Sequence, residues 1–99
     1  MSKNEYLKRS EALCDELEKI PGYKKWRASS RASRRNEISY AVSCKVPEEK
    51  AGLKGNMEKA WFNYLWKTAE LHEEIYGFWP VFEAEELESD DPRLEIYGK

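Results

Sequence analysis

Apolar residues recur at helical spacing over the first twenty residues of the chain. Charged side chains occupy the positions between them, and the apolar ones share one face at a period of 3.6 residues, namely Tyr6, Leu7, Leu13, Cys14, Leu17 and Ile20. Ser2 followed by Glu5 matches a capping box, in which each side chain satisfies a backbone N–H at the start of a helix. Pro21-Gly22 is typical of a helix end. The pattern predicts an amphipathic helix that stops before residue 21.

A second strong helical pattern lies between residues 57 and 76. Its apolar positions form an arc near half the helix circumference, made of Met57, Ala60, Trp61, Tyr64, Leu65, Leu71, His72 and Ile75. An arc of this width is typical of a central helix that packs on more than one neighbour. Gly77 is a natural C-cap for this helix. Pro47-Glu48-Glu49 is a good helix start, but Gly52 and Gly55 weaken this stretch, so we expect a short turn before the main helix.

Residues 37–46 fit two patterns. Apolar and polar residues alternate there as in a strand, with Ile38, Tyr40, Val42, Cys44 and Val46 on one side. Ile38, Ala41 and Val42 also form a helical stripe. A lone strand needs a partner, and the chain offers only weak candidates around residues 81–83 and 94–97. We therefore favour a helix, with a strand in an α+β arrangement as the alternative.

The end of the chain differs in composition from the rest. Residues 78–82, Phe-Trp-Pro-Val-Phe, are too short and too interrupted by proline for a helix, so we expect an extended aromatic segment over the core. Acidic residues dominate after it. The predicted fold is mainly α, a small three-helix domain over residues 1–83 with an acidic C-terminal tail at residues 84–99 that is free or docked on the domain.

Composition is consistent with one domain that has a core, since 40% of the 99 residues are hydrophobic and 13% are aromatic. The net charge of −2 hides an asymmetry. Residues 1–50 carry 12 Lys and Arg against 8 Asp and Glu, a net charge of +4, whereas residues 51–99 carry 5 against 11, a net charge of −6. No apolar run is long enough for a membrane span and no secretory leader is present, so we expect a cytoplasmic protein with Cys14 and Cys44 as reduced thiols.

The residues needed for catalysis or metal binding are scarce. His72 is the one histidine and falls on the apolar arc, where a packed residue is the expected role. A structural zinc site needs four Cys or His ligands at short paired spacings, and this chain has three such residues far apart. No glycine-rich phosphate loop follows a strand. We therefore expect no enzyme activity, no metal and no cofactor.

The clearest candidate binding feature is a basic run. Residues 23–35 hold six basic residues beside one tryptophan and no acidic residue; the run is Lys24, Lys25, Trp26, Arg27, Arg31, Arg34 and Arg35. If residues 27–35 are one helix, their four arginines line one side. Arginine binds phosphates and carboxylates bidentately, and tryptophan stacks on exposed bases. The alternative is a solvated face that pairs with the acidic tail of the same chain.

Aromatic residues give a second candidate. Trp66 and Phe62 lie at and beyond the edge of the apolar arc of the long helix, where burial is harder. An exposed tryptophan is a typical anchor of a protein interface. The alternative is that residues 78–82 or a second subunit cover both rings.

The favoured hypothesis is a non-catalytic protein–protein interaction module, an inhibitor or adaptor of a larger assembly. Its expected contacts are the basic run and Trp66, because exposed aromatics beside arginines are enriched in binding hot spots. The alternative is a nucleic-acid-binding module that uses residues 24–35. The acidic tail also suggests mimicry of a nucleic-acid backbone, and the oligomeric state stays open.

Overall fold

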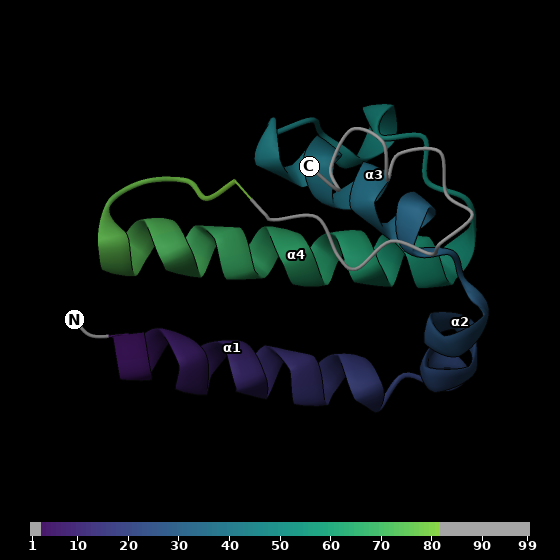
Figure 1. Cartoon of the computed structure of the whole chain (residues 1–99), viewed down its shortest axis with the longest axis horizontal. Helices are drawn as coiled ribbons and strands as arrows, with labels where there is room; N and C mark the ends of the chain where they lie inside the picture. Colours follow the sequence, from purple (N-terminus) through teal and green to yellow (C-terminus); the bar gives the residue numbers. More distant parts are fainter. Residues whose placement is uncertain (1–2, 82–99) are drawn as a thin grey trace, which may run out of the picture.

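The computed structural model describes residues 3–81, and every regular element in that range is a helix. The elements are α1 (Lys3–Glu18), α2 (Tyr23–Ser29), α3 (Ala32–Ser43), the 3-10 helix η1 (Glu48–Lys50) and α4 (Gly55–Tyr76) (Figure 1). The prediction of a mainly α fold is confirmed. Ser2 of the expected capping box, the acidic tail and the candidate strand at 94–97 lie outside the described residues.

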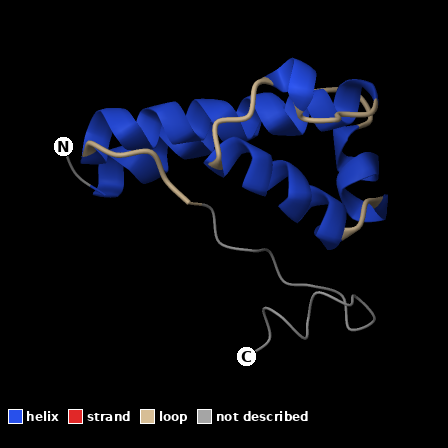
Figure 2. Cartoon of the chain, turned by 90° about the horizontal axis from the view of Figure 1, so that it is seen from above, coloured by secondary structure: helices blue, strands red, loops and turns tan. Residues whose placement is uncertain are grey.

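The long helix α4 is the centre of the arrangement. α1 runs antiparallel along one side of it, and α3 packs obliquely on another side (Figures 1 and 2). The short α2 turns the chain at the end of α1 and leads into α3. The prediction of a central helix with more than one neighbour is confirmed, and its wide apolar arc is the reason.

Two glycines with positive φ stand at helix ends. Gly22 has φ 86° and caps the start of α2, four residues after the end of α1, and Gly77 has φ 87° and ends α4 as the sequence predicts. The Gly77 N–H donates to the carbonyl of Glu73 at 2.8 Å, which satisfies one of the last free carbonyls of α4. Positive φ disfavours a side chain at both positions.

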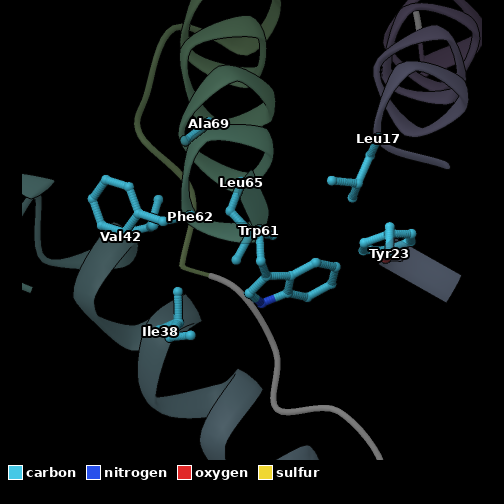
Figure 3. Close-up of a cluster of buried hydrophobic side chains, with 8 residues drawn as sticks. All are labelled: Leu17, Tyr23, Ile38, Val42, Trp61, Phe62, Leu65 and Ala69. Carbon is cyan, nitrogen blue, oxygen red and sulfur yellow. The ribbon is translucent and has the colours of Figure 1, made fainter. Parts of the chain in front are cut away.

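The core lies where α4 meets its two neighbours. It consists of Leu17, Tyr23, Ile38, Val42, Trp61, Phe62, Leu65 and Ala69 (Figure 3). The expectation that Phe62 is hard to bury is wrong, because its side chain is only 2% exposed. Both Phe62 and Ala69 belong to this core, so α4 buries a wider face than its apolar arc alone predicts.

Residues 37–43 are helical, as the helical stripe predicts and the alternating pattern does not. Ile38 and Val42, four residues apart, are 1% and 0% exposed, whereas Tyr40 between them is 69% exposed. A strand would place all three side chains on the same face. The strand alternative is therefore wrong, and the helix ends at Ser43.

The segment after α4 contacts both α3 and α4 through Trp79. The indole Nε1 of Trp79 donates to the carbonyl of Val42 at 2.9 Å, and its ring meets the ring of Trp66 edge-on at 5.1 Å. Lys45 Nζ lies 4.7 Å from the centre of the Trp79 ring. The predicted extended aromatic segment is confirmed as far as residue 81.

None of the helices described over residues 3–81 combines the length and the apolar character that a membrane span requires.

Candidate functional site

The basic run is divided between two helices. α2 ends at Ser29, and Ser30 and Arg31 both have extended backbone conformations, with ψ of 151° and 140°. The condition that residues 27–35 form one helix is therefore not met. Arg27 belongs to α2 and Arg34 to α3, so the four arginines do not line one helix face.

Arg35 is buried and binds the end of α2. It is 7% exposed, and its Nη1 donates to the carbonyl of Ser30 at 2.6 Å and to the carbonyl of Arg27 at 3.3 Å. The same atom lies 2.6 Å from the Ser30 hydroxyl. A cation here satisfies the carbonyls at the C-terminus of α2 and complements the helix dipole. Arg35 thus holds the angle between α2 and α3.

Arg34 is also engaged within the chain. Its guanidinium donates two hydrogen bonds to the buried carboxylate of Glu58 on α4. Its Nη2 also donates to the carbonyl of Gly52 at 2.8 Å. These hydrogen bonds hold the pKa of Glu58 below its ordinary value. Glu37 adds a weaker contact to Arg34 at 3.3 Å. The pair joins α3 to the start of α4.

The remaining cations gather around α2. Lys24, Lys25 and Arg31 are exposed, and Arg27 is half-buried. The guanidinium carbon of Arg27 lies 5.6 Å from the centre of the Trp61 ring, which is a cation–π geometry. Arg27 also lies near the Tyr23 phenol and lowers its pKa, although the raising effect of burial is larger. Lys24 and Arg27 therefore lie at the corner where α1, α2 and α4 meet.

A cavity of about 550 Å³ opens at this corner. The described residues that line it come from all three helices and are Cys14, Glu18, Tyr23, Lys24, Arg27, Ala28, Trp61 and Tyr64. Three of these residues are aromatic, and the charged ones are two cations of α2 and the acidic Glu18 of α1. We call this cavity with the exposed Lys24, Lys25 and Arg31 the α2 corner.

Neighbouring rings hold these walls in place. Trp26 lies between Tyr23 and Trp61, with ring centres 6.0 and 6.2 Å away, and Trp61 lies 5.7 Å from Tyr64. In Figure 3 the indole of Trp61 extends from α4 toward Tyr23, with its nitrogen on the edge away from that ring. That nitrogen is buried and has no hydrogen-bond partner among the described residues. Packing against neighbouring rings therefore positions Trp61 in the cavity wall, and no hydrogen bond from its indole N–H to the described residues contributes.

The two phenols and the thiol of the cavity keep their protons at neutral pH. Burial raises the pKa of Tyr64 to about 12, and burial also raises the pKa of Tyr23. Burial, followed by the nearby carboxylates of Glu18 and Asp15, raises the pKa of Cys14. A thiol of this kind is a weak nucleophile. The cavity offers neutral hydrogen-bond donors beside two cations and the Glu18 carboxylate, a chemistry that suits binding.

His72 lies in a different cluster. Its ring meets Tyr6 at 5.4 Å, Tyr76 at 4.6 Å and Phe78 at 4.8 Å between ring centres. Its Nδ1 is 3.0 Å from the carbonyl oxygen of Phe78. Among residues 3–81, no three His, Cys, Asp or Glu side chains come together in a way that would hold a metal ion. The histidine packs at one end of the helical hairpin, as the sequence predicts.

The search for relatives is negative. No protein-family model matches this chain, and neither the curated proteins nor the solved structures compared with it include a similar one. The site therefore has to be interpreted from its own geometry.

Trp66 is separate from the α2 corner. It is half-buried, stacks on Phe62 at 5.6 Å and meets Trp79 edge-on. The alternative that residues 78–82 cover this ring is confirmed for Trp79. The structure thus gives Trp66 a packing role next to the closing segment.

Sequence reasoning finds the cations of the corner but misses its aromatic walls. It places Tyr23 with the basic run only, and it assigns Trp61 and Tyr64 to the core. Trp61 is a core residue by burial, at 8% exposed, and it also lines the cavity. A usable signal is that Tyr23 and Trp26 precede Arg27 on one short helix, which brings rings and cations to the same corner.

Proposed function

We propose that this chain is a non-catalytic protein-interaction module, an adaptor or inhibitor, whose α2 corner binds an acidic segment of a partner protein. The carrying observation is the juxtaposition of Lys24 and Arg27 with an aromatic cavity of about 550 Å³. Aromatic walls bind apolar side chains, and cations at the rim bind carboxylates. The expected ligand is a segment in which an apolar or aromatic side chain stands beside Asp or Glu.

The chemistry of the cavity supports binding over catalysis. The phenols of Tyr23 and Tyr64 and the thiol of Cys14 all have raised pKa values, so none is an activated nucleophile or base at neutral pH. We also propose a cytoplasmic location, which the two thiols outside any disulfide support.

A protein partner is favoured over nucleic acid because two arginines of the basic run act inside the fold. Arg34 and Arg35 are engaged with Glu58 and with the end of α2. The affinity of nucleic-acid-binding proteins comes largely from many phosphate contacts. The cations left at the corner are few, and the chain as a whole carries a net charge of −2. Nucleic acid stays the rival ligand.

The test is capture of partners from a lysate of the source organism, with and without nuclease. We compare the wild type with the double variant Lys24→Glu/Lys25→Glu, and with Lys50→Glu/Lys59→Glu as a control that changes the charge equally at two other exposed lysines. A third variant, Ala28→Trp, fills the cavity from an exposed position on α2.

The proposal expects a stoichiometric protein that survives nuclease, is lost with the α2 variants and is kept by the control. Loss of all captured material on nuclease treatment, with a steep decrease of affinity with salt, would instead establish the nucleic-acid alternative. Equal capture by all four proteins would remove the α2 corner as the binding site.

A further inference from the structure

A symmetric charge pattern runs along the outer side of α1. At about 100° per residue, seven side chains fall within an arc roughly 120° wide centred on Ala12. They are Glu5, Lys8, Arg9, Ala12, Asp15, Glu16 and Lys19, the last directly after the end of the helix. All are exposed except the half-buried Glu5. We call this arc the α1 outer face.

The α1 outer face lies away from the core, and only its flank at Arg9 and Glu16 borders α4. α1 packs on α4 along one side and meets α2 at its end, and it forms one border of the molecule in Figure 1. Leu17, on the opposite side of α1, is 4% exposed and belongs to the core. The charged arc is therefore open along the length of the helix.

The charges on this face reverse their sign about Ala12. Lys8 and Arg9 stand four and three positions before Ala12, and Asp15 and Glu16 stand three and four positions after it. Glu5 and Lys19, seven positions away on either side, continue the reversal. A helix with this pattern is complementary to a second copy of itself that runs in the opposite direction.

We propose that two copies of this chain associate through the α1 outer face, with the two α1 helices antiparallel and a two-fold axis at Ala12. Such an interface is isologous, so each contact occurs twice. Ala12 has a small side chain, which lets the two helix backbones approach at the axis. The occupant of this face is a second copy of the chain because the charge pattern matches its own reverse.

The helical positions define the expected pairs. On one flank of the interface, Arg9 of one copy faces Glu16 of the other. On the opposite flank, Lys8 of one copy faces Asp15 of the other. Charge pairs of this kind set the orientation and partner choice of packed helices. A parallel arrangement would place like charges opposite each other, so the pattern selects the antiparallel one.

One flank also offers apolar surface. Arg9, Ala12 and Glu16 form part of the α1 wall of a cavity of about 490 Å³ between α1 and α4, which Leu13 and Leu71 also line. A second helix on this flank covers apolar carbon as well as charge. The stems of lysine and arginine add further apolar contact.

The ion pairs within one copy are compatible with this interface. Arg9 donates to Glu74 at 2.6 Å, but a guanidinium has five N–H groups and the Arg9 side chain is 49% exposed. Lys19 lies 3.3 Å from Glu16, and both side chains are over 70% exposed. Exposed pairs are individually weak, so the dimer is expected to be weak and sensitive to salt.

The test is sedimentation equilibrium of the wild type, two charge variants, one control variant and one mixture. The variant Lys8→Glu/Arg9→Glu makes the central charges of the face all negative, and Asp15→Lys/Glu16→Lys makes them all positive. Each variant alone is expected to lose dimer by at least about tenfold in Kd, because four attractive pairs become repulsive. An equimolar mixture of the two variants is expected to regain the association, since every central pair is again of opposite sign.

Recovery in the mixture shows that the single variants lose the dimer through charge repulsion and not through misfolding, because a misfolded chain is not rescued by another variant. The control Lys24→Glu/Lys25→Glu, on the α2 corner, is expected to dimerise like the wild type. A wild type that sediments as a monomer at all concentrations would overturn the proposal. A mixture that stays monomeric while the wild type dimerises would overturn it equally, since another surface would then form the dimer.

Discussion

Arg34 on α3 and Glu58 on α4 are joined by two hydrogen bonds, from Nε to Oε2 at 2.9 Å and from Nη2 to Oε1 at 2.6 Å. The Glu58 carboxylate also accepts the backbone N–H of Lys54 at 2.8 Å, the residue before α4. The side chain of Glu58 is 11% exposed and that of Arg34 is 28% exposed. The pair therefore connects two helices in a place with little water.

Removal of Arg34 is expected to destabilise the fold. Arg34→Ala leaves the Glu58 carboxylate nearly buried without its cation, and we expect a loss of about 2 kcal/mol in the free energy of unfolding. Urea denaturation measures this loss. The control is Arg9→Ala, which breaks an equally short pair with Glu74 whose side chains are half exposed, and which should cost about 0.5 kcal/mol. Equal losses for the two variants would show that burial does not strengthen the Arg34 pair.

The same pair predicts how stability depends on acid. The Arg34 hydrogen bonds lower the pKa of Glu58 in the folded chain below its ordinary value of 4.5. Its contribution is then complete above that ordinary value and is lost as the pH falls through the lowered pKa. Urea titrations from neutral pH to about pH 3 should show the stability difference between the wild type and Glu58→Gln shrinking toward acid. A difference that stays constant over this range would contradict the assignment.

Two tryptophans with opposite hydrogen-bond states give a matched comparison. Trp79 Nε1 is bonded to the Val42 carbonyl, whereas the buried Trp61 Nε1 has no partner among the described residues. Phenylalanine keeps most of the ring and removes the N–H. Trp79→Phe should cost about 1 kcal/mol more than Trp61→Phe, because only the first breaks a hydrogen bond. Thermal or urea unfolding ranks the two variants, and the reverse order would contradict the hydrogen-bond assignment.

The helices were predictable where local pattern and tertiary packing agree. α1 and α4 carry long amphipathic stripes, followed by Pro21-Gly22 and by Gly77, and both form as predicted. At residues 37–46 two periods fit equally well, and the outcome depends on packing. Ile38 and Val42 point into the contact with α4 while Tyr40 between them is exposed, an arrangement that a helix allows and a strand does not. The α4 residues of that contact are distant in the sequence, so the local pattern did not contain it.

The candidate site was less predictable because charge in a sequence does not reveal its partner. Arg34 and Arg35 looked like surface cations in a basic run. Their partners are Glu58, 24 residues away, and the carbonyls of a helix end that forms only because the chain breaks at Ser30. The aromatic walls of the cavity come from α2 and α4, which are distant in the sequence, so no local motif contains them.

Tyr64 predicts a change at alkaline pH. Burial raises its pKa from 10.0 to about 12, so the folded chain holds the phenol proton more strongly than the unfolded chain. The resulting stabilisation is complete below the ordinary pKa and is lost as the pH rises through the raised one. Spectroscopic titration of tyrosinate should show late-ionising tyrosines, and Tyr64→Phe should remove one of them while Tyr23 stays late. If the variant loses an early-ionising group instead, Tyr64 is exposed to solvent.

The two cysteines are expected to differ in their reaction with a thiol reagent at neutral pH. Cys44 is exposed, whereas Cys14 lines the cavity of the α2 corner with a pKa that burial and neighbouring carboxylates raise. Because only the thiolate reacts, iodoacetamide should modify Cys44 first and Cys14 several-fold more slowly. Mass spectrometry of timed samples measures both rates, and Cys44→Ser isolates the slow one. Faster modification of Cys14 would mean that the cavity is open to water and its thiol ionised. The Cys14 rate then also reports on the cavity, because a partner segment seated there would slow it further.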